Sequence, residues 1–408
     1  MTTALVIGGG VAGPVAAMAL RRAGIEAAVY EAHPGPADDI GSFLTLQING
    51  IDALRAVDAY DAVAGAGFAT PSMRLRSGSG KLLGEVGTGA PRPDGTVSVT
   101  LRRSDLYAGL RDEAARRGVR VETGRRLVDA TTAAAGVRVT FADGSTAEAD
   151  ILIGADGLHS RVRTLIDPGA APARYLPVLN VGGYAPPQPD VTGSGGYEMV
   201  FGKRAFFGYA VAPSGEIWWF ANPSRRDEPD PGELAAMTTA QWRSWLAELY
   251  ADDRSPAAAL VASTPGELVG RATYDMPPVR HWHRDRMVII GDAAHATSPS
   301  SGQGASLAIE DAVQLARCLR DVPGTAAAFA AYESLRRTRV EKVVAAGRRT
   351  SNAKAAGPIG RALRDAVLPL VLRRVGSGPG WVHEHHIDWD APVVPSRSSP
   401  ETGHVTQR

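Results

Sequence analysis

The stretch ALVIGGGVAGPVAAMALRRAGIEAAVYE, residues 4–31, predicts a short strand, a glycine-rich turn, a helix and a second strand. Gly8 permits the tight turn into the helix, Gly10 leaves room for a pyrophosphate, and Gly13 lets the helix lie against the sheet. Glu31 ends the second strand, where its carboxylate can accept hydrogen bonds from ribose hydroxyls. The pattern therefore predicts a dinucleotide site, without distinguishing FAD from NAD. Its other predicted contacts are Val11, Ala12 and Ala32.

A second motif, ILIGADGLHSRVR at residues 151–163, places Asp156 and Gly157 directly after a predicted strand. Asp-Gly is also one of the commonest turn dipeptides, so these residues by themselves favour an ordinary turn. Any binding role for the pair depends on the motifs that lie on either side of it in the chain.

A third motif, VIIGDAAHATSPSSGQGASLAIEDA, spans residues 288–312. Asp292 follows a buried strand, where a carboxylate can accept hydrogen bonds from a sugar or ribityl hydroxyl. The loop that follows exposes backbone N–H groups at the start of a helix, which suits a phosphate or a negatively charged reduced flavin. The predicted contacts in this loop are Pro299, Gly302, Gln303, Gly304, Ala305 and Ser306. His295 is predicted to be a structural hydrogen-bond donor rather than a general base.

Charge and composition exclude several other functions. Forty-four basic and 43 acidic side chains in 408 residues leave a net charge of +1, which argues against nucleic acid or an anionic membrane as the main partner. No apolar segment approaches the roughly 20 residues of a membrane span, and we expect a cytoplasmic protein. The single cysteine, Cys318, excludes an internal disulfide and a cysteine-built metal site. No metal site is predicted, because His383, His385 and His386 fit better a surface segment that packs on the domain.

The order of the predicted elements indicates an α/β fold: a Rossmann-like nucleotide-binding domain, an inserted and mainly antiparallel sheet, and C-terminal helices. The resemblance of the three motifs to a known family implies that the first is a GR2-type FAD-binding domain and that the inserted sheet belongs to a substrate domain. The FAD-binding domain is predicted to comprise residues 1–70, 100–167 and 271–350, and the substrate domain residues 71–99 and 168–270. A helix is expected over 232–252. Residues 351–390 are predicted to form a C-terminal helical segment, and 391–408 a disordered tail.

The three motifs, in this order, resemble the group A flavoprotein monooxygenases, the aromatic hydroxylases of the p-hydroxybenzoate and salicylate hydroxylase type. The resemblance runs from Met1 to about Arg349. It assigns Gly8, Gly10, Gly13 and Glu31 to the ADP end of FAD. It assigns Asp156 and Gly157 to the pyrophosphate and to NAD(P)H use. Asp292 is assigned to the ribityl chain, Arg103 to the flavin side, and Leu127 to a backbone contact near the adenine. Ser306 departs from the pattern, because many members have Asn there.

The resemblance implies permanently bound FAD, transient binding of NADPH or NADH, and O2 as co-substrate. Reduced flavin would form a C4a-hydroperoxide that transfers one oxygen atom to an aromatic or polycyclic small molecule, typical of secondary metabolism. No side chain is predicted to be catalytic with certainty. Phe207, Tyr209 and Trp219 either line the substrate pocket or form the core of the inserted sheet.

Three alternatives remain open from the sequence. An alkene epoxidase of the same family would use the same chemistry, and only its pocket would differ. A reductase or dehydrogenase would insert no oxygen, and a flavin-containing sequestration protein would leave its ligand unchanged. The chain is expected to be a monomer or a homodimer.

Overall fold

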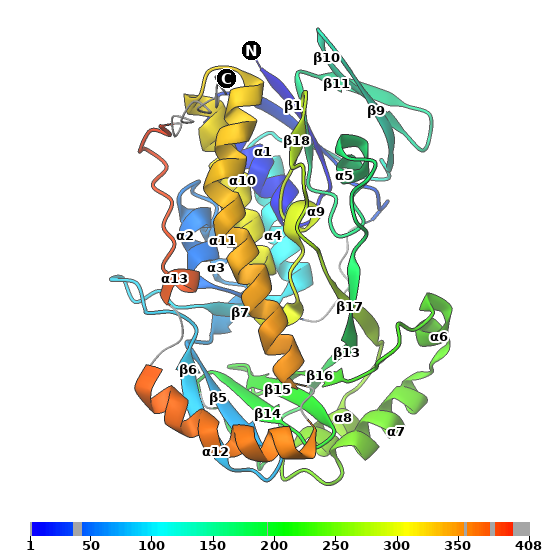
Figure 1. Ribbon diagram of the computed structural model, residues 1–408, viewed down its shortest axis with the longest axis vertical. Helices are drawn as coiled ribbons and strands as arrows, with labels where there is room; N and C mark the ends of the chain where they lie inside the picture. Colours follow the sequence, from blue (N-terminus) through cyan, green and yellow to red (C-terminus); the bar gives the residue numbers. More distant parts are fainter. Residues whose placement is uncertain (1, 36–42, 194, 355–356, 376–379, 395–408) are drawn as a thin grey trace, which may run out of the picture.

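The structure, a computed structural model, describes residues 2–35, 43–193, 195–354, 357–375 and 380–394. Its upper half is built on a six-stranded sheet in the order β18-β19-β12-β1-β2-β8 (Figure 1). The strands are β1 (Thr3–Ile7), β2 (Glu26–Tyr30), β8 (Arg120–Glu122), β12 (Ile151–Gly154), β18 (His283–Arg284) and β19 (Met287–Ile289). All neighbouring pairs are parallel except β18–β19. The central strands β1 and β12 are buried along almost their whole length, as expected for a sheet covered on both faces.

Helices cover one face of this sheet: α1 (Ala12–Arg22), α4 (Arg103–Arg116) and α10 (Gly304–Asp321) pack against one another. The other face carries α5 (Arg161–Ile166) and a three-stranded sheet of β9 (Leu127–Ala133), β10 (Gly136–Phe141) and β11 (Thr146–Ala149). Cys318 is buried in α10, and burial raises the pKa of its thiol to about 11, as expected for a core residue rather than a reactive thiol.

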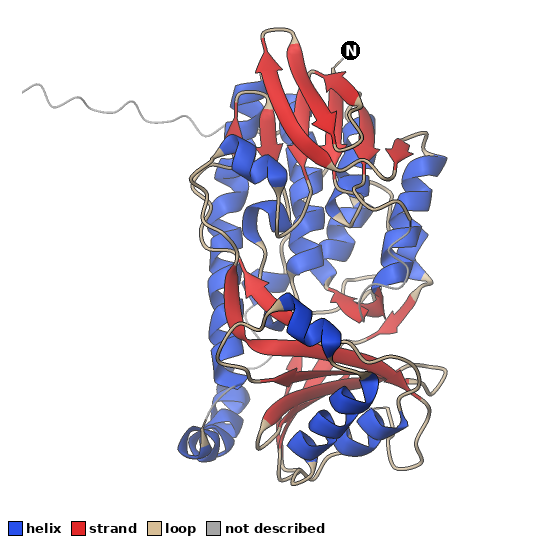
Figure 2. Ribbon diagram, turned by 90° about the vertical axis from the view of Figure 1, so that its right-hand side faces the viewer, coloured by secondary structure: helices blue, strands red, loops and turns tan. Residues whose placement is uncertain are grey.

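The lower half is a seven-stranded sheet in the order β17-β13-β16-β15-β14-β5-β6, seen below the first sheet in Figure 2. Its strands are β5 (Ser72–Ser77), β6 (Leu82–Gly87), β13 (Arg174–Ala185), β14 (Tyr197–Phe201), β15 (Ala205–Val211), β16 (Ile217–Pro223) and β17 (Arg271–Asp275). Every neighbouring pair is antiparallel except β5–β14. The predicted α/β class with a mainly antiparallel second sheet is therefore confirmed.

Two boundaries differ from the sequence-based expectation. The helix predicted over 232–252 is two helices, α6 (Pro231–Ala236) and α7 (Thr239–Tyr250), because Thr238 and Gln241 form a reciprocal capping box that starts α7. Strand β17, predicted to belong to the FAD-binding domain from residue 271, instead pairs with β13 in the seven-stranded sheet. Helices α7 and α8 (Ala257–Ser263) cover the outer face of this sheet.

A small sheet of β3 (Phe43–Leu46), β7 (Val99–Arg102) and β4 (Gly67–Ala69) lies between the two halves, with α2 (Ile48–Arg55) and α3 (Asp61–Ala64). Helix α9 (Asp292–His295) and the short 3-10 helix η1 (Pro299–Ser301) precede α10. The long helix α11 (Thr325–Lys354) runs from the upper half down to the lower sheet, and α12 (Pro358–Val375) and α13 (Gly380–His383) follow (Figure 1). None of the described helices combines the length and apolarity needed to cross a membrane.

Candidate functional site

The three motifs follow three parallel strands that lie next to or near one another in the upper sheet. Gly8 follows β1, Asp156 follows β12, and Asp292 follows β19. Since β1–β12 and β12–β19 are parallel pairs, the turns after them emerge at the same edge of the sheet. Glu31, after β2, emerges there as well. The carboxyl-terminal edge of such a sheet is where open α/β folds bind ligands, and all three motifs converge on it.

Glycine is required where these turns touch. A Cβ on Gly8, whose φ is +109°, would lie 2.2 Å from the carbonyl oxygen of Ala155 in the second motif. A Cβ on Gly13 would lie 1.9 Å from the carbonyl oxygen of Gly8. By contrast, no described atom lies within 4 Å of a Cβ placed on Gly10. Gly8 and Gly13 therefore serve the packing of the protein itself, whereas the space beside Gly10 is open to a ligand.

This difference predicts opposite effects for two single-methyl changes. Gly10→Ala is expected to leave the unfolding midpoint of the apoprotein unchanged and to weaken FAD binding by more than about tenfold, because the methyl group occupies the space meant for the pyrophosphate. Gly13→Ala is expected to cost about 1–3 kcal/mol of stability through overpacking against Gly8. Denaturant unfolding and fluorescence titration with FAD, done on both variants, measure the two effects. Equal loss of stability in both would contradict this assignment.

Glu31 is oriented by two backbone donors. The backbone N–H of Gly9 donates to Oε2 at 2.6 Å, and that of His33 donates to Oε1 at 2.8 Å. These bonds fix the carboxylate beside the glycine turn while leaving lone pairs for further donors, since an ionised carboxylate accepts about four hydrogen bonds. Its predicted role toward a ribose fits this geometry, and the roles of Val11, Ala12, Ala32 and Leu127 stay predictions.

Asp156 holds its own turn together. Its carboxylate accepts from Ser160 Oγ at 2.5 Å and from the backbone N–H groups of Arg161 and Val162 at 2.7 and 3.1 Å, so it caps the start of α5. Burial raises the pKa of Asp156, although these donors favour the ionised form. Gly157 adopts φ +76° and has open space around it, which leaves its backbone accessible. Asp156 is thus placed as a positioning residue, and contact of this turn with pyrophosphate stays a prediction.

Asp292 is the free carboxylate of the site. It is exposed at the end of the turn after β19 and accepts no hydrogen bond from any residue that the structure describes. Although Asp292 is exposed, desolvation by the protein atoms around its carboxyl raises the pKa of that group, while the charges of His295 and Arg103 lower it in part. Arg103, the first residue of α4, donates to Tyr107 Oη at 2.8 Å. An unpaired acceptor with a nearby guanidinium fits the hydroxyl-rich ribityl chain predicted for this position.

The start of α10 offers backbone donors to the same space. Gly302 adopts the left-handed conformation, with φ +61°, and within the described chain no side chain caps α10 after Gln303. A Cβ at Gly304 would lie 3.9 Å from Oδ1 of Asp292, so the helix start faces the third motif. Uncapped N–H groups, the free Asp292 and the open space at Gly10 together fit a flavin dinucleotide.

Two of the predicted contacts in this loop use their side chains elsewhere. Ser306 Oγ accepts the backbone N–H of Gln47 at 3.1 Å, and a Cβ on Gly50 would lie 2.6 Å from that oxygen. The hydroxyl of Ser306 therefore ties α10 to α2, and only its backbone N–H is available to a cofactor. The fully buried side chain of Gln303 accepts from Asn49 at 2.9 Å. Contact of these two residues with the cofactor stays a prediction.

A buried charge network behind the site was not predicted. Arg336 of α11, only 1% exposed, donates to Asp311 at 2.7 Å and to Glu310 at 2.5 Å. Burial by itself would raise the pKa of Glu310, but Arg336 and Arg339 outweigh it and lower that pKa to about 2. In the sequence, Glu310 and Asp311 appear only as two charged residues within the predicted helix of the third motif.

Asp311 connects this network to the third motif. It accepts the backbone N–H of Gly291 at 2.9 Å and also pairs with His295 Nε2. Burial would raise the pKa of Asp311, but His295 and Arg336 hold it well below its usual range. The predicted structural role of His295 is confirmed, since its ring holds the turn that presents Asp292.

The three C-terminal histidines contact three different partners. His383 Nδ1 lies 3.3 Å from Gln303 Nε2, His385 Nε2 lies 3.9 Å from Glu310, and His386 Nδ1 lies 2.8 Å from Asp52. This confirms that the segment packs on the upper half. The predicted tail, 391–408, falls mostly outside the described residues.

The same segment predicts a pH dependence. Burial, with Arg339 close to both, lowers the pKa of His383 and of His385 from 6.5 to about 4. Because the unfolded chain binds these protons more tightly, their contribution to stability is complete above pH 6.5 and is lost as the pH falls toward 4. Urea midpoints measured across this range should decline. The double variant His383→Gln/His385→Gln should show a flatter profile, and an unchanged slope would contradict the assignment.

The three aromatic residues that the sequence assigns either to the substrate pocket or to the sheet core lie on the face of the lower sheet covered by α7 and α8. Phe207 and Trp219 are 0% exposed, stack at 5.5 Å between ring centroids, and belong to the core under α7 and α8. Tyr209 shares that face and lines a small polar hollow with Arg76 and Glu198. Period-2 alternation places Phe207 and Tyr209 on one face of β15, but it does not reveal which face meets the upper half. Of the two alternatives left open by the sequence, burial supports the sheet core over the substrate pocket for the three residues.

The opposite face of the sheet is aromatic too, and it meets the upper half. Phe43 of β3 lies 5.6 Å from Trp218 and 6.2 Å from Phe220 between ring centroids, and 6.3 Å from Tyr184. The guanidinium of Arg102 lies 4.3 Å from the ring centre of Tyr184. Phe43, Tyr184 and Phe220 are only half-buried, so they retain surface that another flat group can cover.

Comparison with known proteins agrees with this site. Residues 1–347 match the family model described as "FAD binding domain". The chain is 31% identical over 353 residues to the aurachin C monooxygenase/isomerase of Stigmatella aurantiaca, covering 84% of this chain and 87% of that protein. It is 29% identical over 350 residues to the FAD-dependent urate hydroxylase of Klebsiella pneumoniae, covering 85% and 88%. The crystal structure of Klebsiella pneumoniae HpxO complexed with FAD and uric acid superposes with a TM-score of 0.81 at 26% identity, over 92% of this chain and 94% of that one.

The chain therefore belongs to the FAD-binding-domain family of group A flavoprotein monooxygenases. It is an FAD-dependent monooxygenase of the hydroxylase type, and FAD is its bound cofactor. Its homologues bind small-molecule substrates, and HpxO is seen in complex with uric acid.

Proposed function

We propose that this chain uses NADPH or NADH and O2 to hydroxylate an aromatic or polycyclic small molecule. The supporting observation is the convergence of three motif turns on one sheet edge, with the free Asp292 and the uncapped start of α10 beside them. Relatives named as a urate hydroxylase and an aurachin C monooxygenase support a small ring compound as substrate. The proposal includes the cytoplasm as compartment, a role in secondary metabolism, and a monomer or homodimer.

Bound FAD supplies the redox chemistry, and the chain's own residues hold and orient it. Glu31 accepts from the ribose, Asp292 accepts from the ribityl hydroxyls, and Arg103 adds positive charge on the same side. The N–H groups at Gly304 and Ala305 stabilise negative charge at the helix start, where the positive end of the helix dipole lies. Asp311 fixes the turn that presents Asp292, because it accepts from the backbone N–H of Gly291 and pairs with His295.

The substrate is proposed to bind against Phe43, Tyr184 and Phe220, in place of the residues predicted from sequence. Their rings are half-buried and lie on the face of the lower sheet that meets the upper half. Apolar ring faces favour a flat partner through offset or edge-to-face packing, and they exclude water from the reacting region. Arg102, which pairs with Glu216 at 2.8 Å, lies beside Tyr184, and its guanidinium favours an electron-rich ring.

The test begins with the absorption spectrum of the purified protein, first under anaerobic NADPH or NADH and then in air with candidate ring compounds. Bleaching on reduction and one isotopically labelled oxygen atom from O2 in the product are the expected results. Turnover of reductant with an artificial acceptor and no labelled product would instead identify a reductase. A ligand recovered unchanged under all conditions would identify a sequestration protein, and a labelled epoxide would identify the epoxidase.

A further inference from the structure

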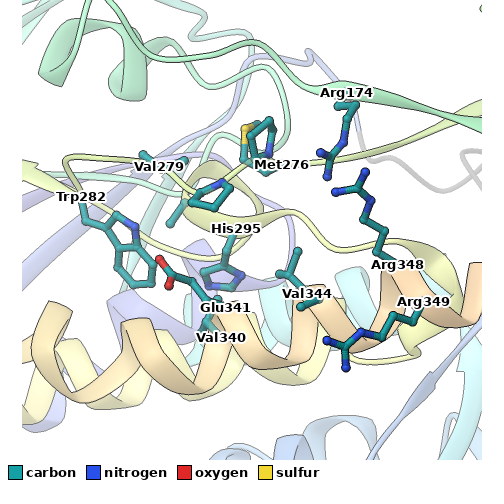
Figure 3. A pocket seen from close by; sticks show the side chains of 14 residues that line it. Arg174, Met276, Val279, Trp282, His295, Val340, Glu341, Val344, Arg348 and Arg349 are labelled. Carbon is teal, nitrogen blue, oxygen red and sulfur yellow. The ribbon is translucent and has the colours of Figure 1, made fainter.

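A cavity of about 390 Å³ lies between the segment 276–282, α9 and α11, outside the flavin site (Figure 3). None of the predicted FAD contacts lines it. It reaches the third motif only through Ala294 and His295 of α9. Its volume falls at the lower end of the range for small-molecule pockets, about 300–1,000 Å³.

The inner end of this cavity holds two buried polar atoms without hydrogen-bond partners in the described chain. They are Nε1 of Trp282, a side chain 1% exposed, and Nδ1 of His295, 5% exposed. Both side chains line the cavity (Figure 3). The indole N–H can only donate. Asp311 accepts from His295 Nε2, so Nδ1 is the ring nitrogen left for a ligand; it accepts a hydrogen bond in the neutral imidazole and donates one in the imidazolium. A ligand group that both accepts and donates, such as a hydroxyl, would satisfy the two atoms together.

The mouth of the cavity carries uncompensated positive charge. Arg174 is paired with Asp275 through bonds of 2.9 and 2.8 Å, and Glu341 is paired with Arg337 at 3.1 Å. Arg348, by contrast, forms no hydrogen bond or ion pair with any residue that the structure describes, and the same holds for the adjacent Arg349. Buried or half-buried apolar groups lie between mouth and inner end, including Met276, Val279, Val340 and Val344. Apolar walls with cations at one end favour an amphipathic anion.

We propose that this cavity is a second small-molecule site, which binds a hydroxylated organic acid. The acidic group lies at Arg348 and Arg349, the apolar body lies against Met276 and Val344, and the hydroxyl reaches Trp282 and His295. The site is coupled to the flavin, because Asp311 accepts from both His295 and the backbone N–H of Gly291. A ligand on His295 Nδ1 thus acts on the turn that presents Asp292. The binding step does not depend on the proposed oxygenation.

The test uses the FAD-loaded protein and, as probe, the aromatic acid anilinonaphthalene sulfonate, followed by equilibrium dialysis. Arg348→Glu is expected to weaken binding by about tenfold or more, since it replaces an attractive charge with a repulsive one. The matched control is Lys342→Glu, an exposed position on the same helix that does not line the cavity, and it should bind as the parent does. Val344→Trp, which fills the cavity, should abolish binding while the unfolding midpoint shows that the variant is folded.

Equal affinity in the parent and in the Arg348→Glu and Val344→Trp proteins would overturn the site. Displacement of the probe by NADPH or NADH would overturn the organic-acid assignment and identify a nucleotide as the occupant. A hydroxylated analogue of the probe should bind more tightly than the probe itself, and equal affinity would contradict the role of Trp282 and His295. Coupling is expected to appear as a change in the visible flavin spectrum on binding to the parent, absent in Val344→Trp. Binding without any spectral change would overturn the coupling.

Discussion

Purified Asp292→Ala protein is expected to contain little or no FAD. The carboxylate accepts no hydrogen bond within the described chain and stands at the turn after β19, beside the uncapped start of α10. Its loss removes charge-assisted hydrogen bonds to the cofactor, each worth about 1.5–3 kcal/mol. Two such bonds correspond to a drop in affinity of roughly two to four orders of magnitude. The ratio of flavin to protein absorbance after gel filtration measures the effect.

The matched control is Asp227→Ala, an exposed carboxylate on the lower half that lies outside the site. It should purify with the same flavin content as the parent protein. Apoprotein of both variants should unfold at the midpoint of the parent apoprotein, because Asp292 supports no bond within the described chain. Full flavin occupancy in Asp292→Ala would contradict the assignment of the third motif to the ribityl chain.

Among substitutions that remove one charged side chain, Arg336→Met is expected to lower the free energy of unfolding the most. It removes the guanidinium that pairs with Glu310 and Asp311, both fully buried, and leaves carboxylates only partly compensated by Arg339 and His295. Breaking a buried ion pair from one side costs about 3–5 kcal/mol. Denaturant unfolding of the apoprotein should therefore show a large fall in midpoint without a change in slope.

Arg116→Met tests whether the effect comes from burial. Arg116 also pairs with a carboxylate, that of Glu113, but its side chain is 71% exposed. Water already solvates the guanidinium of Arg116, and Glu113 keeps its ion pair with Arg117 at 2.7 Å, so the midpoint of Arg116→Met should stay near that of the parent. Comparable losses in the two variants would mean that the network around Arg336 contributes no more than a surface pair.

The sheet-edge location of the flavin site was predictable because each motif follows its strand directly in the sequence. Gly8, Asp156 and Asp292 are local signals, and parallel pairing alone brings them to one edge. The division of residues 232–252 into two helices also has a local signal in the sequence, since Thr238 and Gln241 have the spacing of a capping box. That spacing marks the start of a second helix inside the segment predicted as one.

The substrate face and the charge network could not be predicted in the same way. Period-2 alternation groups Phe207 with Tyr209, but which face meets the upper half is decided by α7 and α8, which come later in the chain. Arg336 lies on a helix whose sequence shows no sign of its partners in α10. Both features depend on contacts between distant segments, and neither leaves a periodic pattern in one sequence.

The strand order of the upper sheet also determines when the protein can fold during synthesis. Ala4 pairs with Ile151, and Leu152 in turn pairs with Met287, so β12 keeps an unpaired apolar edge until β19 has left the ribosome. Pairing between strands that are far apart in the sequence is slow, and a strand edge that is still unpaired aggregates readily. Expression that slows synthesis before residue 287, or that truncates the chain there, should therefore yield insoluble protein.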